Sequence, residues 1–141
     1  MDRQPLDNLV QIGQLKKEAP DQQELEGLIH SGSIRLQDSR LEGLSLESRF
    51  DLAYNAAHAL ALAALRWHGY RSENRYQVFQ CLTHTLDFLP AQCRVLDQAH
   101  RKRNLAEYEG HLDVDQSLVR GLILVTQSVL DGVLKLGPVS R

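Results

Sequence analysis

Hydrophobic residues recur along most of the chain at intervals of three and four positions, the spacing of one face of an α-helix. The clearest series begins after Ser45, whose side chain is suited to cap a helix, and ends near Gly69. Its members are Leu46, Phe50, Ala53, Tyr54, Ala57, Leu60, Ala61, Ala64 and Leu65. The many alanines in this stripe let another helix backbone come close, so we predict that this segment is the central helix.

Two helical segments are predicted before the central helix. Apolar residues at helical spacing in Leu6–Leu15 indicate a short leading helix or arm, which Pro20 closes off. Asp21 and Glu24 have the spacing of a capping box, so a first long helix is expected to begin there and to end near Gly43.

Three more helical segments are predicted after the central helix. The first covers about Asn74–Phe88 and is stopped by Pro90, and the second covers Ala91–Glu109. The last is expected to follow a capping box of Asp113 and Gln116 and to fray after Gly132, with an apolar seam made of Leu118, Leu122, Val125, Val129 and Leu130.

Strand signals are missing, because the chain has no alternating run of β-branched residues and no hairpin turn between two such runs. The pattern therefore predicts an all-α fold, an antiparallel, up-and-down bundle of four to five helices. We expect residues 1–20 to form the N-terminal arm and residues 21–136 to form one bundle domain.

Composition agrees with one folded domain and narrows the possible partners. The 141 residues are 43% hydrophobic and 24% charged, which is ordinary globular usage. A net charge of -2 and a pI of 6.3 exclude nucleic-acid binding by bulk positive charge, so any such contact must be local.

Localisation is expected to be cytoplasmic, without membrane insertion. The N-terminus lacks the apolar core of a secretory signal, and the longest apolar stretch, Ala56–Leu65, is far shorter than the ~20 residues that cross a bilayer. Cys81 and Cys93 form no C-x-x-C pair and are expected to be reduced packing residues.

The fourth long segment carries a polar face in its second half. At ~100° per residue, one side of this helix presents His100, Arg103, Asn104, Glu107, Tyr108 and His111. Arg101 and Lys102 lie beside this face, and the run HRKRN is the one strongly basic spot of a mildly acidic chain. A basic patch is what a phosphate backbone would contact. A solvated helix surface with local pairs, such as Arg103 with Glu107, explains the pattern equally well.

Two stretches of the sequence resemble the HEPN superfamily. They are SLESRFDLAYNAAHALALAALRWHGYR from Ser45 to Arg71 and RKRNLAEYEG from Arg101 to Gly110, with A-Y-N-A and R-N-x-x-E-Y as the most specific elements. The similarity is to a bacterial branch of small HEPN proteins and covers most of the chain from Asp21 to the last helix. It implies a helical bundle that dimerises so that two fourth-helix motifs share a cleft. It further implies metal-independent ribonuclease activity, in toxin–antitoxin, phage-defence or RNA-processing systems.

The family signature is an arginine, often followed by a polar residue, and then a histidine four to six residues later. Arg103 and Asn104 match the first two positions, but Tyr108 stands where the histidine is expected and His111 lies beyond the window. Metal-free RNA cleavage needs an acid and a base near neutral pH, and a tyrosine with a pKa of ~10 is a poor base. Either Tyr108 acts as an acid or orients the substrate while Arg103 stabilises phosphate charge, or His111 or His100 supplies the base.

The hypothesis we prefer is a binding domain whose polar cleft takes RNA, a nucleotide or a protein partner, with a metal-independent ribonuclease as the alternative. Arg103, Asn104 and Tyr108 form its centre, and His100, Arg101, Glu107 and His111 form its surroundings. No metal and no cofactor are expected. We expect a homodimer and a separate protein partner, such as an antitoxin or a nucleotidyltransferase.

Other candidates have simpler interpretations. His58 lies near the buried stripe, where a histidine is usually a core or boundary residue. Asp97 and His100 have the spacing of a bundle metal site, but the paired Glu-x-x-His motifs of such sites are absent. Tyr54 and Asn55 either satisfy each other or a neighbouring helix, or line the cleft opposite Arg103. The sequence has no phosphate-binding glycine loop and no hydrolase motif.

Overall fold

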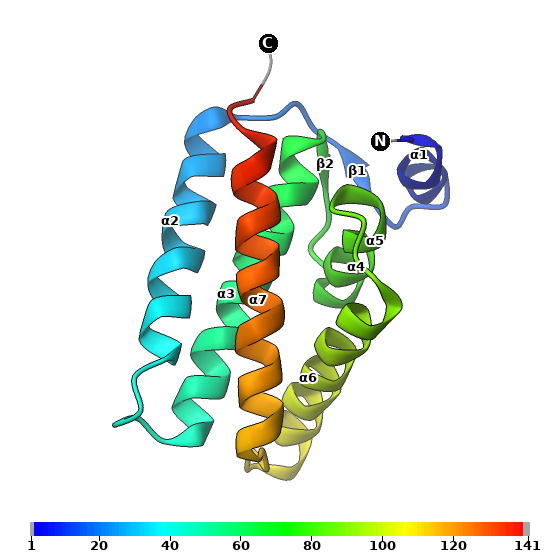
Figure 1. The fold of residues 1–141 in the computed structure, drawn as a ribbon. Helices are drawn as coiled ribbons and strands as arrows, with labels where there is room; N and C mark the ends of the chain where they lie inside the picture. Colours follow the sequence, from blue (N-terminus) through cyan, green and yellow to red (C-terminus); the bar gives the residue numbers. More distant parts are fainter. Residues whose placement is uncertain (1, 140–141) are drawn as a thin grey trace.

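Four helices of 18 to 22 residues make up most of the computed structural model, which describes residues 2–139. In chain order they are α2 (Gln22–Ser39), α3 (Leu46–Trp67), α6 (Pro90–Glu109) and α7 (Gln116–Leu136). Consecutive long helices run in opposite directions, and α7 lies in front of α3 between α2 and α6 (Figure 1). The prediction of an all-α helical bundle is confirmed.

Shorter elements cover one end and one side of this bundle. They are α1 (Gln4–Gln11), α4 (Arg75–Gln80), α5 (Leu82–Thr85), β1 (Lys16–Lys17) and β2 (Tyr70–Arg71). The two strands pair antiparallel, with Lys16 opposite Arg71 and Lys17 opposite Tyr70. The expectation of a strand-free chain was therefore wrong in detail, because a two-residue ladder is too short to show any alternation of hydrophobic residues.

Several predicted helix ends are confirmed. The side chain of Asp21 accepts a hydrogen bond from the backbone N–H of Gln23, and that of Ser45 accepts one from Ser48. Both acceptors satisfy backbone groups that the first turn of a helix leaves unpaired. Gly110 ends α6 with a φ of 85°, the left-handed conformation that glycine adopts without strain.

Other predicted boundaries were wrong. The segment Asn74–Phe88 is not one helix, since it divides into α4 and α5 at Cys81. Pro90 was predicted only to stop the preceding helix, but it is also the first residue of α6. Its missing N–H is harmless there, because the first N–H groups of a helix have no partner within the helix.

The last helix also differs from its prediction. Asp115, and not Asp113, caps α7 by accepting from the N–H of Leu118. The helix continues past Gly132 to Leu136, and a Cβ on Gly132 would lie 3.0 Å from a Leu86 methyl group. Gly132 therefore marks a close packing contact and does not start a frayed tail.

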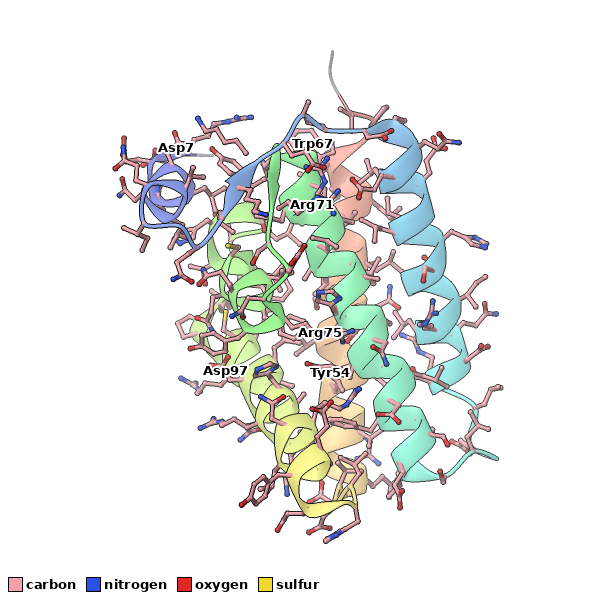
Figure 2. The ribbon with its side chains drawn as sticks, turned by 180° about the vertical axis from the view of Figure 1, so that it is seen from behind. Asp7, Tyr54, Trp67, Arg71, Arg75 and Asp97 are labelled. Atoms are coloured by element: carbon pink, nitrogen blue, oxygen red, sulfur yellow. The ribbon has the colours of Figure 1, made fainter. Side chains whose placement is uncertain are left out.

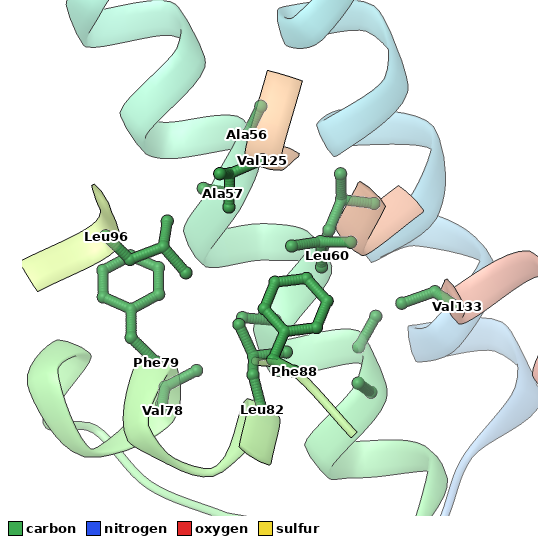
Figure 3. Close-up of a cluster of buried hydrophobic side chains, with 14 of the residues drawn as sticks. Ala56, Ala57, Leu60, Val78, Phe79, Leu82, Phe88, Leu96, Val125 and Val133 are labelled. Atoms are coloured by element: carbon green, nitrogen blue, oxygen red, sulfur yellow. The ribbon is translucent and has the colours of Figure 1, made fainter. Parts of the chain in front are cut away.

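The core is centred on α3, which packs chiefly against α2 and α7. Its small residues face the neighbouring helices, while Phe79, Leu82 and Phe88 fill the space beside it (Figure 3). Gly32 of α2 lies against Leu60 of α3, and a Cβ at this glycine would come within 2.5 Å of the Leu60 Cγ. This contact sets how closely α2 approaches α3.

A buried arginine ties the N-terminal arm to the bundle. Arg66 is 2% exposed, and its guanidinium donates to Glu24 Oε1 at 2.7 Å, to the carbonyl of Glu18 at 2.9 Å and to that of Ala19 at 2.7 Å. Arg71 also pairs with Glu24. Glu24 thus serves this network, and not the capping box predicted with Asp21.

One helix among the described residues, α7, is long and apolar enough to span a membrane when judged by length and composition alone. Its inner side contributes Val119, Leu122, Val129 and Val133 to the core of this chain. The core helices of soluble proteins pass the same test.

Candidate functional site

The polar cluster of interest lies where α3, α4 and α6 meet around the side chain of Tyr54. This ring is 1% exposed because Tyr54 belongs to the buried stripe of α3. Its hydroxyl lies 3.0 Å from Nδ1 of His100 on α6. Tyr54, Arg75 and Asp97 come from the three helices and gather in one region of the bundle (Figure 2).

Two arginines approach the ring of Tyr54. The guanidinium carbons of Arg75, from α4, and Arg103, from α6, each lie 5.5 Å from the ring centroid. Cations near an aromatic face are attracted by its quadrupole, by roughly 0.5–1 kcal/mol at exposed sites and more where water is excluded. Arg75 also donates to the side-chain oxygen of Asn55 at 3.0 Å. The ring of Tyr54 therefore lies next to two positive groups from different helices.

His100 uses both ring nitrogens. Its Nδ1 faces the Tyr54 hydroxyl and its Nε2 lies 3.1 Å from Nδ2 of Asn104. Burial lowers the pKa of His100, Arg75 lowers it further, and Asp97 opposes both effects. The histidine is therefore neutral at neutral pH, and Asn104 donates to Nε2 if the other ring nitrogen carries the proton.

Burial also raises the pKa of Tyr54, against the opposing influence of Arg75 and Arg103. A phenol with a raised pKa stays protonated at neutral pH, so it acts here as a hydrogen-bonding group and not as a base. The guanidinium groups of Arg75 and Arg103 pack against the Tyr54 ring.

Arg103 is only loosely paired. Its guanidinium lies 3.8 Å from Asp51 Oδ1 and 3.7 Å from Glu107 Oε1, beyond hydrogen-bonding distance in both cases. The side chain is 31% exposed, yet its Nη1 atom is buried and has no hydrogen-bond partner among the described residues. Such an unsatisfied buried donor is a cost that an added acceptor would remove.

Five of the residues predicted for the site lie near one another, four in one group and the fifth in an adjoining hollow. His100, Arg103, Asn104 and Glu107 form the connected group described above. The fifth, His111, shares with Arg103 and Glu107 an open hollow of about 420 Å³, whose remaining lining residues are Glu47, Asp51, Ala106, Gly110 and Leu112.

The other two predicted residues lie apart from this group. Tyr108 is 92% exposed and makes no hydrogen bond within residues 2–139. Arg101 lines a groove on the α7 side of α6. Projection on an ideal helix put Tyr108 at the edge of the polar face, and in the structure this side chain points into solvent.

Arg75 is the site residue that the sequence analysis missed. It stands at the start of α4, which was predicted only as part of a longer helix, and its contact with Tyr54 depends on how α4 packs between α3 and α6. No spacing in the sequence connects Arg75 with Arg103. The sequence left Tyr54 as either a structural residue or a cleft residue; in the structure it is buried, with its hydroxyl near His100 and its ring next to Arg103.

The remaining chemistry-bearing groups do not form a site. The part of the chain that the structure describes has no group of three or more His, Cys, Asp or Glu side chains suited to a metal ion. Asp97 accepts a hydrogen bond from Gln80 at 2.8 Å. Both cysteines are free, and burial raises the pKa of Cys81 to about 11, so its thiol is unreactive. Burial lowers the pKa of the half-buried His58 to about 4.

The sequence matches no family model, and no curated protein or solved structure shows significant similarity to it. The cluster around Tyr54 is therefore interpreted from its own geometry.

Proposed function

We propose that this chain is a HEPN-like helical domain that binds RNA through phosphate contacts with Arg75 and Arg103. The observation that carries the proposal is the convergence of two guanidinium groups from different helices on the ring of Tyr54, each 5.5 Å from its centre. Arginine suits phosphate because its planar fork of N–H donors matches the oxygens of that group. Because each guanidinium carbon lies 5.5 Å from the centre of the Tyr54 ring, the two groups are at most twice that distance apart. They can therefore contact neighbouring phosphates of one strand.

The state of Arg103 supports this role. A phosphate that displaces Asp51 and Glu107 replaces two long ion pairs with direct charge-assisted hydrogen bonds. It also supplies an acceptor for the unpaired Nη1 atom after a small rotation of the side chain. Asn104 is exposed and carries the amide group that could bond to a base or a ribose.

The dimer and the cellular setting belong to the same proposal. A second copy that meets this face of α6 would add its own Arg75 and Arg103 to a shared cleft. A domain that binds cellular RNA would act in the cytoplasm, together with a separate protein partner of the kind the resemblance implies.

A metal-independent ribonuclease is the second candidate, favoured by the lowered pKa of His100. A neutral imidazole can accept the proton of a ribose 2′-hydroxyl as that oxygen attacks phosphorus and the bond to the 5′-oxygen breaks; the imidazolium then returns the proton to the leaving 5′-oxygen, while Arg103 stabilises charge on the phosphate. For this step Nε2 must be released by Asn104, because both ring nitrogens are engaged in the free protein. Binding without cleavage needs no such release, and we therefore place it first.

Labelled single-stranded RNA tests both candidates in one experiment. Fluorescence anisotropy should show binding by the wild type, clear weakening by Arg75→Gln and by Arg103→Gln, and no change for Arg35→Gln. Arg35 is a suitable control because it is exposed on α2 and, among residues 2–139, bonds only to Ser31 of its own helix.

The same proteins, together with His100→Ala, are incubated with the RNA in EDTA, and a gel reveals any cleavage. Intact RNA agrees with a binding domain, whereas cleavage lost in both His100→Ala and Arg103→Gln supports the ribonuclease. Equal RNA affinities for the wild type, Arg75→Gln, Arg103→Gln and Arg35→Gln would exclude phosphate contacts at this cluster.

A further inference from the structure

A second surface of interest lies on the opposite side of α6, along the first half of α7. Two grooves flank the exposed ridge of α7 there. The first, of about 630 Å³, separates α6 from α7 and is lined by Val95, Gln98, Arg101, Lys102, Leu105, Asp115, Ser117, Leu118 and Gly121. The second, of about 480 Å³, separates α7 from the end of α2 and the start of α3, and is lined by Arg40, Glu42, Arg49, Gln116, Val119, Arg120, Ile123 and Leu124.

This surface is distinct from the cluster around Tyr54. Leu105 follows Arg103 by two positions, which places it ~200° further around α6. Arg103 faces α3 and Tyr54, whereas Leu105 faces the groove beside α7. Figure 1 shows α7 in front of α3, with α2 and α6 on either side of it.

The charge of the two grooves is opposite in sign to that of the whole chain. Their linings contain five cations, Arg40, Arg49, Arg101, Lys102 and Arg120, and two carboxylates, Glu42 and Asp115. The chain as a whole has 16 Lys and Arg against 18 Asp and Glu. Asp115 is further engaged, because its side chain caps α7.

Three of these cations have no polar partner among the described residues. The side chains of Arg101, Lys102 and Arg120 make no hydrogen bond and no ion pair within residues 2–139. Arg40 and Arg49, by contrast, donate to Gln127 and to the carbonyl of Ser39. The free cations therefore stand on both sides of the ridge, two from α6 and one from α7.

Apolar groups lie between the cations. Leu124 is 64% exposed and Leu105 is 49% exposed, and the grooves also expose parts of Val95 and Leu118. Gly121 leaves the floor of the first groove open, since a Cβ there would touch only a Val95 methyl group at 3.9 Å. A helix can thus come close to α7 at this point.

We propose that these grooves dock an acidic amphipathic helix of a partner protein. The apolar face of the partner helix would pack on Leu105, Leu118 and Leu124. Its carboxylates would form ion pairs with Arg101, Lys102 and Arg120. A nucleic acid would use the cations but leave the leucines uncovered, so the mixture of apolar and basic groups favours a protein helix.

A pair of synthetic peptides tests the proposal. Both carry leucines at helical spacing, and the remaining positions are glutamate in one and lysine in the other. Fluorescence anisotropy with the full chain should show the glutamate peptide binding at least about tenfold more tightly than the lysine peptide, by complementary charge. Arg101→Glu/Lys102→Glu should weaken it by a similar factor, and Leu124→Ser should weaken it too. Ile12→Ser is the matched control, because Ile12 is 69% exposed on the distant arm.

Three results would overturn the proposal. The first is that the glutamate peptide fails to bind, or binds no better than the lysine peptide. The second is that single-stranded RNA competes for the surface and loses affinity with the same charge reversals, in which case the grooves bind nucleic acid. The third is that Leu124→Ser dissociates a dimer in sedimentation, in which case a second copy of the chain covers the surface. Because Arg75→Gln and Arg103→Gln should leave peptide binding unchanged, this test is independent of the RNA site.

Discussion

Gly32 and Gly27 provide a matched test of the packing that positions α3. Both glycines lie inside α2, so replacing either with alanine brings the same gain in helix propensity, roughly 0.8–1.0 kcal/mol. Their surroundings differ. A Cβ at Gly27 would meet nothing within 4 Å, whereas one at Gly32 would come within 2.5 Å of the Leu60 Cγ and 2.7 Å of its Cδ2.

The clash at Gly32 cannot be relieved cheaply. Leu60 is fully buried, and its Cδ1 also lies only 3.1 Å from the added carbon, so rotating the side chain exchanges one contact for another. Overpacking of this kind costs typically about 1–3 kcal/mol. We therefore expect Gly27→Ala to raise the free energy of unfolding by up to about 1 kcal/mol. The free energy of unfolding of Gly32→Ala should be lower than that of Gly27→Ala by about 1–3 kcal/mol.

Urea unfolding followed by circular dichroism measures both variants, with the midpoint as the readout and an unchanged m-value as the check on two-state behaviour. If Gly32→Ala stabilises the protein as much as Gly27→Ala does, α2 does not approach α3 as closely as described. The placement of Asp51, Tyr54 and Asn55 on α3 would then lose its support.

Further predictions concern pH, the buried arginine and the RNA site. Because the pKa of His58 falls from 6.5 in the unfolded chain to about 4, its contribution to stability is complete above pH 6.5 and is lost as the pH falls towards 4. The loss amounts to no more than about 3 kcal/mol, and His58→Gln should flatten the dependence of urea midpoints on pH. Arg66→Met should cost roughly 1–3 kcal/mol, because it leaves the carbonyls of Glu18 and Ala19 without their donor while Glu24 keeps its contact with Arg71, and a melting temperature equal to that of the wild type would contradict this network. Glu107→Gln should tighten RNA binding by up to about twofold, since it removes a competitor for Arg103 worth a few tenths of a kcal/mol, and weaker binding in the anisotropy assay would contradict the displacement of Glu107 by phosphate.

Hydrophobic periodicity predicted the long helices well because it reports directly on burial. Ser45 and Asp21 cap their helices as expected, and Gly110 ends α6, since these effects depend on neighbours within one turn. Errors arose where a choice between similar local signals depends on packing. Both Asp113 and Asp115 are suited to cap a helix, and only the path of the chain into α7 selects Asp115.

The candidate site was less predictable than the fold. His100, Arg103, Asn104 and Glu107 share one side of a single helix, and helical geometry alone places them together. Arg75 enters the cluster through the packing of α4 against α3 and α6, and no periodicity describes such a contact. Tyr108 fails to join the cluster because it lies at the edge of the face, where a rotation of a few tens of degrees separates contact from exposure.

The most direct test of the central claim is the salt dependence of RNA affinity. For single strands, each phosphate contact contributes about 0.7 to the slope of log K against log salt concentration. If Arg75 and Arg103 each hold one phosphate, the double variant Arg75→Gln/Arg103→Gln should have a slope smaller in magnitude by about 1.4 than the wild type, while Arg35→Gln keeps the wild-type slope. A double variant with an unchanged slope would contradict the assignment of this cluster as an RNA phosphate site.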